Sequence, residues 1–193
     1  MRKSLNYKVV HVRKLLNEAS MHTETFSKAS NLHCQQGCYS CCLKRDLYAS
    51  SLEFFPLAYE LYKEGTAETV YDKIGNLPQN APCYFFTPFE QNGGCSRYND
   101  RGLICRLFGF SSNTDKNDKP RLITCKGIKQ TDAFQNLLPS VLGKSPNFSD
   151  FYIRLASLDF QLANEQLQIN EAIHKALEIV LNYESLRNRR IPA

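Results

Sequence analysis

The chain has 193 residues, of which 42% are hydrophobic, and a formal net charge of +5. This size suits one domain over residues 1–193, and no apolar run reaches the roughly 18 residues that a membrane span needs. The basic start of the chain is not followed by an apolar run or a cleavage site, so we predict no secretory signal, no membrane partner and a cytoplasmic location. The other basic residues are scattered, and the densest group, 187–190, ends a predicted helix, so we do not expect nucleic acid as a partner.

The first predicted element is an amphipathic helix from about Ser4 to Lys28. Apolar residues recur there at steps of three and four, which places them on one face of a helix. These residues are Leu5, Val9, Val12, Leu16, Ala19 and Phe26. We expect this face to pack against the rest of the domain.

Four cysteines then fall within nine residues: Cys34, Cys38, Cys41 and Cys42. Four more follow at Cys83, Cys95, Cys105 and Cys125. Disulfide bonds would need an oxidising compartment, and one catalytic thiol would explain only one or two cysteines. Metal ligation explains their number and clustering together, so we predict that all eight are metal ligands.

The spacing of the first four cysteines indicates more than one metal atom. Cys38 and Cys41 form the Cys-x-x-Cys pair that commonly binds zinc or iron. Cys41 and Cys42 are successive residues, whose side chains diverge, so the two thiolates do not readily share one ion. Two ions with about four sulfurs each, or one iron-sulfur cluster with some cysteines left over, both satisfy this pattern.

Two helices are predicted after the first cysteines. Ser50 and Glu53 have the spacing of a capping box, which opens a helix that Gly65 ends. Thr66 is placed to cap a second helix that runs through Ile74. We expect this pair to be structural.

The chain changes character between Leu77 and Pro88, where three prolines favour extended segments and turns. The apolar run after Cys83 predicts a short strand. Gln91–Gly94 is typical of a tight turn, and its backbone amides could donate to a thiolate at Cys95.

The cysteines and their neighbours resemble the YkgJ-like cysteine-cluster family, the CxxCxxCC zinc- or iron-chelating domain. Cys34, Cys38, Cys41 and Cys42 match its first signature, roughly C-x3-C-x2-C-C. Cys83, followed by the stretch from Cys95 to Cys105-Arg106, matches its second. Gly102 stands where the family usually has proline, which leaves that turn less constrained. The resemblance implies a metal-chelating core over residues 34–125 and no particular reaction.

Three residues near the proposed ligands are candidates for binding a cofactor: Arg106, Arg101 and Tyr98. An arginine beside thiolates offsets their charge and donates hydrogen bonds, and for Arg106 the resemblance favours such a role. Arg101 suits an exposed salt bridge equally well. The Tyr98 hydroxyl could bond a sulfur or a ligand, although a half-buried core tyrosine is the simpler interpretation.

The remaining chain is predicted as a polar loop from Ser111 to Arg121, a short extended piece before Cys125, and a helical C-terminal region over 147–190. Asn147 or Ser149 would cap that region. The loop lacks the glycine and final glutamate of a calcium site. The predicted fold is therefore mainly α, with amphipathic N- and C-terminal helices packed around an irregular cysteine-rich region with little β.

Three functions fit these predictions. The first is a binding module that chelates Zn²⁺ or iron, with metal ions as its partners and no catalytic residue. The second is an iron-sulfur enzyme, because flagellin lysine methylases have a similar cysteine cluster, although that resemblance is local. The third is a zinc-stabilised scaffold that binds a protein partner through its terminal helices.

Overall fold

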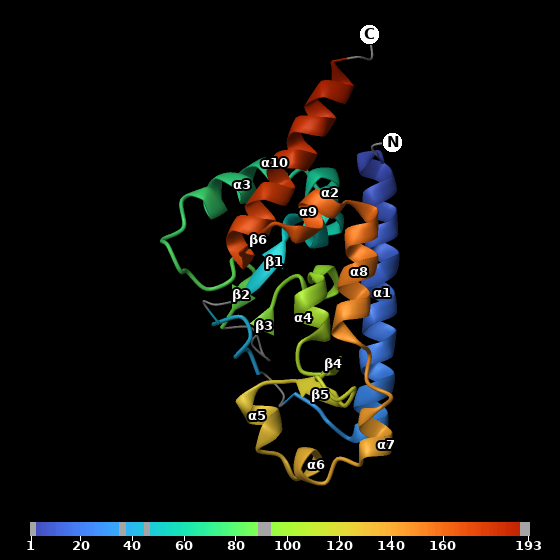
Figure 1. Ribbon diagram of the computed structural model, residues 1–193. Helices are drawn as coiled ribbons and strands as arrows, with labels where there is room; N and C mark the ends of the chain where they lie inside the picture. Colours follow the sequence, from blue (N-terminus) through green and yellow to red (C-terminus); the bar gives the residue numbers. More distant parts are fainter. Residues whose placement is uncertain (1–2, 35–37, 45–46, 89–93, 190–193) are drawn as a thin grey trace.

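The computed structural model describes residues 3–34, 38–44, 47–88 and 94–189. Its longest helix, α1 (Leu5–Ser30), runs along one side of the molecule (Figure 1). All six apolar residues predicted for its inner face are buried. The Ser4 side chain accepts a hydrogen bond from the Tyr7 backbone N–H at the start of α1, and Asn31, with φ of 55°, ends the helix. The periodicity of the sequence therefore placed this helix correctly.

A second helical layer packs on α1 and consists of η1 (Ser51–Phe54), α2 (Phe55–Lys63), α3 (Ala67–Gly75) and α10 (Ile169–Asn188). The predicted capping box of Ser50 and Glu53 is present. Thr66 is the N-cap residue of α3, as predicted, but its side chain makes no cap hydrogen bond, because its hydroxyl donates instead to the Leu61 carbonyl at 3.4 Å.

The C-terminal region is interrupted twice. It contains α8 (Phe148–Leu158), α9 (Phe160–Asn164) and the strand β6 (Gln166–Gln168) before α10. As predicted, Asn147 caps the first of these helices, since its side chain accepts from the Asp150 N–H. Strand β6 pairs antiparallel with β1 (Tyr48–Ser50), with Ala49 opposite Leu167. This pairing holds the start of α10 against η1 and the chain that follows the first cysteines.

The middle of the chain is made of short elements. They are β2 (Phe86–Thr87), β3 (Gly94–Cys95), η2 (Tyr98–Asp100), α4 (Leu103–Leu107), β4 (Ser111–Thr114), β5 (Pro120–Ile123), α5 (Lys126–Lys129), α6 (Asp132–Gln135) and α7 (Pro139–Leu142). Most of the predicted turn at Gln91–Gly94 lies outside the described residues.

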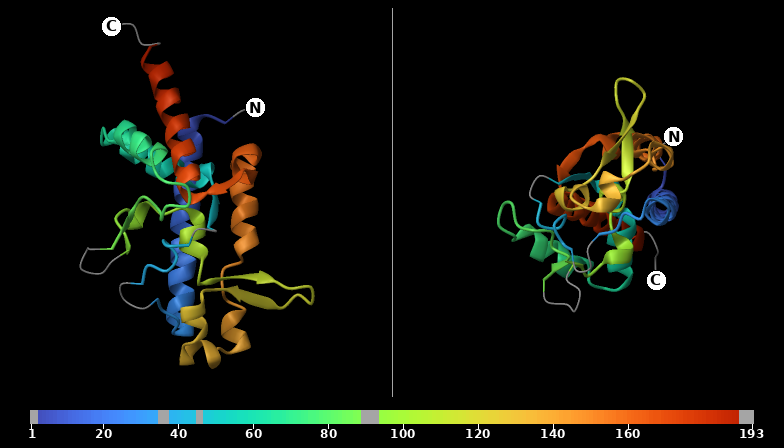
Figure 2. Two further views of the ribbon diagram at one scale, coloured as in Figure 1. Left: turned by 90° about the vertical axis from the view of Figure 1, so that its left-hand side faces the viewer. Right: turned by 90° about the horizontal axis from the view of Figure 1, so that it is seen from below.

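The predicted polar loop Ser111–Arg121 is wrong in part, because β4 and β5 form an antiparallel hairpin that projects from the body (Figure 2). Its base is buried: Ser111 donates to the Leu107 carbonyl, and Ser112 accepts from the Ser145 hydroxyl. Polar side chains can be buried here because their hydrogen bonds are made within the protein.

The described residues form two apolar clusters of very different size. The main core lies between α1, α2, α4, α8 and α10. A small second core of Phe26, Leu32 and Ile128 lies where the end of α1 meets α5, α6 and α7 (Figure 1). The architecture is mainly α with three short strand pairs in the described chain, which confirms the predicted fold class. No described helix has the length and apolarity to cross a membrane.

Candidate metal centre

The eight cysteines lie in the connections and short elements between the long helices. Cys34 follows α1, Cys83 precedes β2, Cys95 ends β3, Cys105 is on α4 and Cys125 caps α5. Cys38, Cys41 and Cys42 belong to the short described stretch 38–44. All eight are free thiols; Cys34 and Cys38 are exposed and the other six are partly buried.

Four of these thiols gather beside α4 at the edge of the main core: Cys42, Cys83, Cys95 and Cys105. The Cys83 backbone N–H donates to the Cys42 carbonyl at 3.2 Å, which joins the two halves of the cysteine set. Cys95 lies opposite Phe86 in the β2–β3 pair, so it is close to the Cys83 turn. Cys83, Cys95 and Cys105 all pack against the main core. We call these four residues the α4-side group.

The other four, Cys34, Cys38, Cys41 and Cys125, lie toward the second core. Cys125 packs against that core, and Leu32, two residues before Cys34, is one of its members and only 1% exposed. The neighbouring thiols of Cys34 and Cys125 add to the effect of burial on the pKa of Cys41, which places the three close together. We call these four residues the α5-side group.

Burial favours the protonated form of three of these thiols, Cys41, Cys83 and Cys105. Desolvation, followed by repulsion from neighbouring thiols, raises the pKa of Cys41 to about 12. Burial likewise raises the pKa of Cys83 to about 12 and that of Cys105 well above its ordinary value. A metal cation stabilises the thiolate and reverses this effect, so metal binding must displace protons.

Backbone N–H groups are already directed at three of the sulfurs. Burial raises the pKa of Cys83 and of Cys95. The backbone N–H groups of Phe85 and Arg97, respectively, oppose that rise. Cys125 Sγ accepts from the Ile128 N–H at 3.4 Å. Hydrogen bonds of this kind stabilise a thiolate more than a thiol, so the sulfurs present suit a thiolate-bound metal.

Arg101 places a cation near both groups. Desolvation raises the pKa of four thiols, and the Arg101 guanidinium opposes that rise; they are Cys34, Cys42, Cys95 and Cys105. The guanidinium lies 3.5 Å from the centre of the Tyr98 ring, and its Nε donates to the Tyr98 carbonyl. Tyr98 itself is 62% exposed, so the interpretation of a half-buried core tyrosine is wrong. Its ring supports the arginine from the solvent side.

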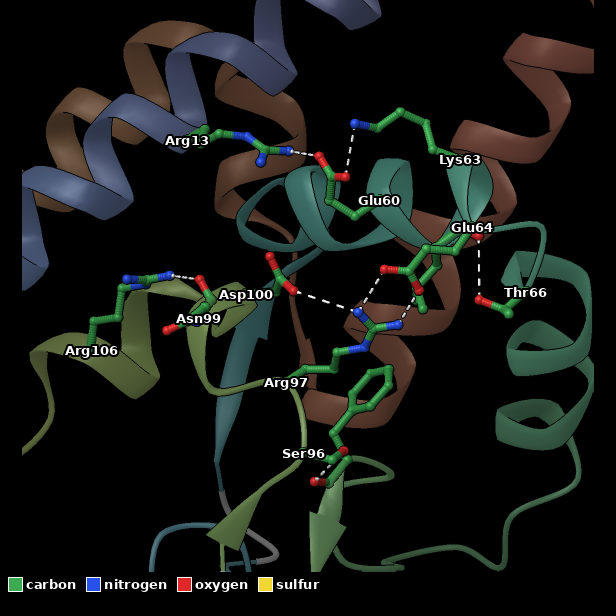
Figure 3. Close-up of polar contacts among 12 residues, drawn as sticks. Arg13, Glu60, Lys63, Glu64, Thr66, Ser96, Arg97, Asn99, Asp100 and Arg106 are labelled. Atoms are coloured by element: carbon green, nitrogen blue, oxygen red, sulfur yellow. Dashed lines mark hydrogen bonds and ion pairs between the residues drawn. The ribbon is translucent and has the colours of Figure 1, made fainter.

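Arg106 is buried, and its guanidinium braces the loop between two proposed ligands. It donates to the backbone carbonyl of Asn99 (Figure 3). It also donates to the Arg101 carbonyl and to the Ser20 hydroxyl on α1. These hydrogen bonds fasten the loop that separates Cys95 from Cys105 to the first helix.

Arg97 fastens the same loop on its other side. Its guanidinium makes a two-point ion pair with Glu64 at the end of α2, and Asp100 lies 3.9 Å away (Figure 3). Sequence reasoning missed this pair, since nothing in the local pattern indicates that residues 33 positions apart meet.

A buried carboxylate holds the start of α4, the helix that carries Cys105. Glu53 is fully buried and accepts from the backbone N–H groups of Ser50 at 3.0 Å and Ile104 at 2.9 Å, and from the Tyr152 hydroxyl at 3.3 Å. Burial raises the pKa of Glu53, and these hydrogen bonds oppose the rise. The capping-box pattern identified Glu53 as a cap, but not its link to α4.

The structure explains the glycine that replaces the usual proline at position 102. A Cβ on Gly102 would lie 2.7 Å from the Phe54 ring and 3.3 Å from the Glu53 carboxylate. The phenyl ring therefore occupies the space of a side chain, and only glycine allows this approach. Packing against Phe54 and Glu53 constrains this turn, so the expectation of a less constrained turn at Gly102 is wrong.

Asn170, at the start of α10, positions the chain around Cys83. Its amide oxygen accepts from the Tyr84 N–H at 2.9 Å, and its amide nitrogen donates to the carbonyls of Ala81 and Pro82. Asn170 also lines a cavity of about 660 Å³ between α3, α10 and the loop 77–81. The described residues around that cavity include no cysteine, so it is separate from the thiol groups.

The sulfurs are neighbours, but they do not yet converge on a point. Among the described residues, no three Cys, His, Asp or Glu side chains are arranged to hold one ion. His33, next to Cys34, is exposed, and its ring contacts Ser27 and Asn31. Ligation therefore requires the thiols of each group to turn inward.

A helical body with eight free thiols in the connections around one arginine-braced loop defines a cysteine-cluster protein. Residues 33–126, just under half of the chain, match the family model "CxxCxxCC: Putative zinc- or iron-chelating domain". The match confirms the resemblance seen in the sequence, and the matched segment contains all eight cysteines. Searches of the curated proteins and of the solved structures found no match.

Proposed function

We propose that the protein binds zinc or iron through its cysteine thiolates and acts as a metal-chelating module. The observation that carries this proposal is that thiols from four separated parts of the chain are neighbours, within a segment whose family is described as chelating. Sulfur-only donor sets suit zinc and iron, whereas magnesium and calcium prefer oxygen.

The surrounding residues support this function in three ways. Backbone N–H groups donate to sulfur, as at Cys125, and stabilise the deprotonated ligand. Arg101 offsets part of the negative charge that thiolates bring. Arg97 and Arg106 hold the loop between Cys95 and Cys105 in place, so these two ligands are partly positioned before metal binds.

Elemental analysis and absorption spectra of protein purified without oxygen test the proposal. We expect stoichiometric metal; zinc leaves the protein colourless, and an iron-sulfur cluster absorbs near roughly 400 nm. A colourless, zinc-only protein would exclude the iron-sulfur enzyme as an alternative.

The variant Cys95→Ser/Cys105→Ser should hold less metal per chain than wild type. His33→Ala is the matched control, because His33 adjoins Cys34 but bonds to Ser27 and Asn31, and it should retain the full metal content. Folded wild-type protein without metal, or equal metal content in all three proteins, would refute chelation by these thiols.

A further inference from the structure

A cavity of about 660 Å³ lies between α3, the start of α10 and the loop 77–81. The chain arches away from the body after α3 and returns toward β2 (Figure 1). Cavities that hold small organic ligands span roughly 300–1,000 Å³. The volume is therefore sufficient for one small molecule, and the described residues that line the cavity include none of the proposed metal ligands.

Hydrogen bonds hold the loop 77–81 against the start of α10. The Asn170 amide donates to the Ala81 carbonyl at 3.3 Å, and the Gln168 amide donates to the Asn80 side-chain oxygen at 3.4 Å. Asn80 has a φ of 63°, a left-handed conformation that asparagine tolerates and that turns the chain here. Specific contacts therefore build the cavity in the absence of a ligand, which lowers the cost of binding one.

Much of the cavity wall is hydrocarbon. The apolar lining residues are Ile74, Leu77, Pro78, Ala81, Leu167 and Ile169. His174 adds an aromatic surface, because its ring stacks on Tyr71 with 4.0 Å between the ring centroids. Gly75 makes room for this ring, since a Cβ there would lie 3.1 Å from His174 Nε2. A ligand of this cavity should therefore have an apolar body.

The charged residues of the wall differ in how they are engaged. Lys175 pairs with Glu165 at 2.7 Å, and Lys44 Nζ lies 5.7 Å from the centre of the Phe108 ring. Both lysine charges are thus directed at residues outside the cavity lining. Glu178 lines the cavity and makes no hydrogen bond or ion pair within the described part of the chain. The charge offered to a ligand is therefore negative.

A second carboxylate lines the cavity on the same helix. Glu171 and Glu178 are two helical turns apart on α10, about 10 Å along the axis, so both face the same side. Glu171 uses one of its oxygens to accept from the Gln168 N–H at 3.2 Å. Two carboxylates at this spacing beside an apolar wall match two ammonium groups joined by an aliphatic chain.

We propose that this cavity is a binding site for an aliphatic polyamine. One ammonium group pairs with Glu178 and another with Glu171, and the methylene chain lies along the apolar wall. The chain as a whole has a formal net charge of +5, so general attraction does not explain the binding of a cation. The site uses no cysteine and does not depend on the proposed chelating function.

Calorimetric titration of the full-length protein with spermidine at low ionic strength tests the site. Wild type should bind one equivalent, and hexanoate, an anion with an aliphatic chain, should not bind. Glu178→Gln should weaken spermidine binding at least about tenfold, through loss of a charge-assisted contact. Ala81→Leu, which fills part of the cavity without a change of charge, should weaken it by at least as much. Glu68→Gln is the matched control, because Glu68 is exposed on α3 outside the cavity lining, and it should bind like wild type.

Proton NMR adds a readout of position. His174 lines the cavity, whereas the other three histidines lie on α1 or directly after it: His11, His22 and His33. Spermidine should shift the imidazole signals of one histidine of the four, the one whose signals are missing from His174→Gln.

Three results would overturn the polyamine site. They are neither heat nor a shift on addition of spermidine, equal weakening by Glu68→Gln and Glu178→Gln, and shifts spread over all four histidines. Wild-type affinity in a folded Ala81→Leu variant would show attraction to the surface and would overturn the site as well. If Ala81→Leu does not fold, as judged by circular dichroism, the two glutamate variants and the histidine signals still decide the outcome.

Discussion

The helical body and the cysteine-bearing loops are held in place by different physical means. The body, formed by α1, α2, α8 and α10, buries apolar side chains at helical spacing, and Phe55, Leu61 and Leu177 are almost completely inaccessible. The loops that carry the cysteines are attached to this body at separate points, through Arg97, Arg106 and Glu53. We therefore expect the body to fold by burial alone, and the loops to need both the body for position and the proposed metal to complete their packing.

Among the tests of this contrast between the helical body and the cysteine-bearing loops, removal of the metal should have the largest effect. Zinc bound by thiolates contributes on the order of 10 kcal/mol in small sites, and that free energy should stabilise mainly the loops. After chelation, hydrogen exchange should rise strongly in residues 38–44 and 94–106 and change little in α1 and α10. Uniform deprotection of helices and loops would contradict the division into a self-sufficient body and dependent loops.

A cavity in the helical body should have the opposite effect: it should lower the stability of the protein and leave its metal content unchanged. Leu177→Ala removes a side chain with no exposed surface from the centre of α10 and should lower the free energy of unfolding by about 3–4 kcal/mol. Urea denaturation measures the loss. The metal content of the folded variant should equal that of wild type, and a reduced content would show that the core and the centre are coupled more tightly.

Glu53 joins the two regions, so its variants test the junction. Glu53→Gln replaces an acceptor with a donor that faces N–H and O–H groups in a buried site, and it should cost about 3 kcal/mol. Tyr152→Phe is the matched control, because it removes only the 3.3 Å hydrogen bond and should cost about 1 kcal/mol in urea unfolding. Equal losses in the two variants would argue against Glu53 as the link to α4.

The pKa values of the thiols predict how metal binding depends on pH. Burial raises the pKa of Cys41 and Cys83 to about 12, so at neutral pH zinc must displace their protons. Apparent affinity should rise with pH by about 1.4 kcal/mol per pH unit for each proton released, as calorimetry in buffers of different ionisation enthalpy would show. Affinity that does not change between pH 6 and 8 would contradict protonated ligands.

The stability of the metal-free protein should depend on pH in the opposite direction to metal affinity. A raised pKa in the folded state means that the unfolded thiols ionise first, from their ordinary value of 9.0. Stability should therefore be constant below about pH 9 and fall as the pH rises toward 12, as urea midpoints would reveal.

The smallest expected effects come from two exposed arginine pairs, one in each region. Arg154→Ala removes an ion pair with Glu18 on the body surface, and Arg97→Ala removes the pair that anchors the loop to Glu64. Each should change the free energy of unfolding by less than about 1 kcal/mol. Only Arg97→Ala should speed zinc release, by up to about fivefold, because Arg97 anchors the loop that carries Cys95. Equal release rates in the two variants would show that Arg97 does not support the proposed centre.

The sequence by itself determined the helices and the identity of the cluster. The spacing of apolar residues predicted α1 and its buried face, the Ser50 and Glu53 pattern predicted a capping box, and the cysteine spacing identified the family. These features are local, because helical periodicity and capping depend on residues three or four positions apart.

Only the tertiary structure decided which distant residues meet. It paired β1 with β6, turned the supposed polar loop at Ser111 into a hairpin, joined Arg97 to Glu64, and separated the surroundings of Cys41 from those of Cys42. Such contacts depend on how whole helices pack and where their connections then lie. A pattern of neighbouring residues does not encode that information, so the eight thiols could be recognised from the sequence, but their division into two groups could not.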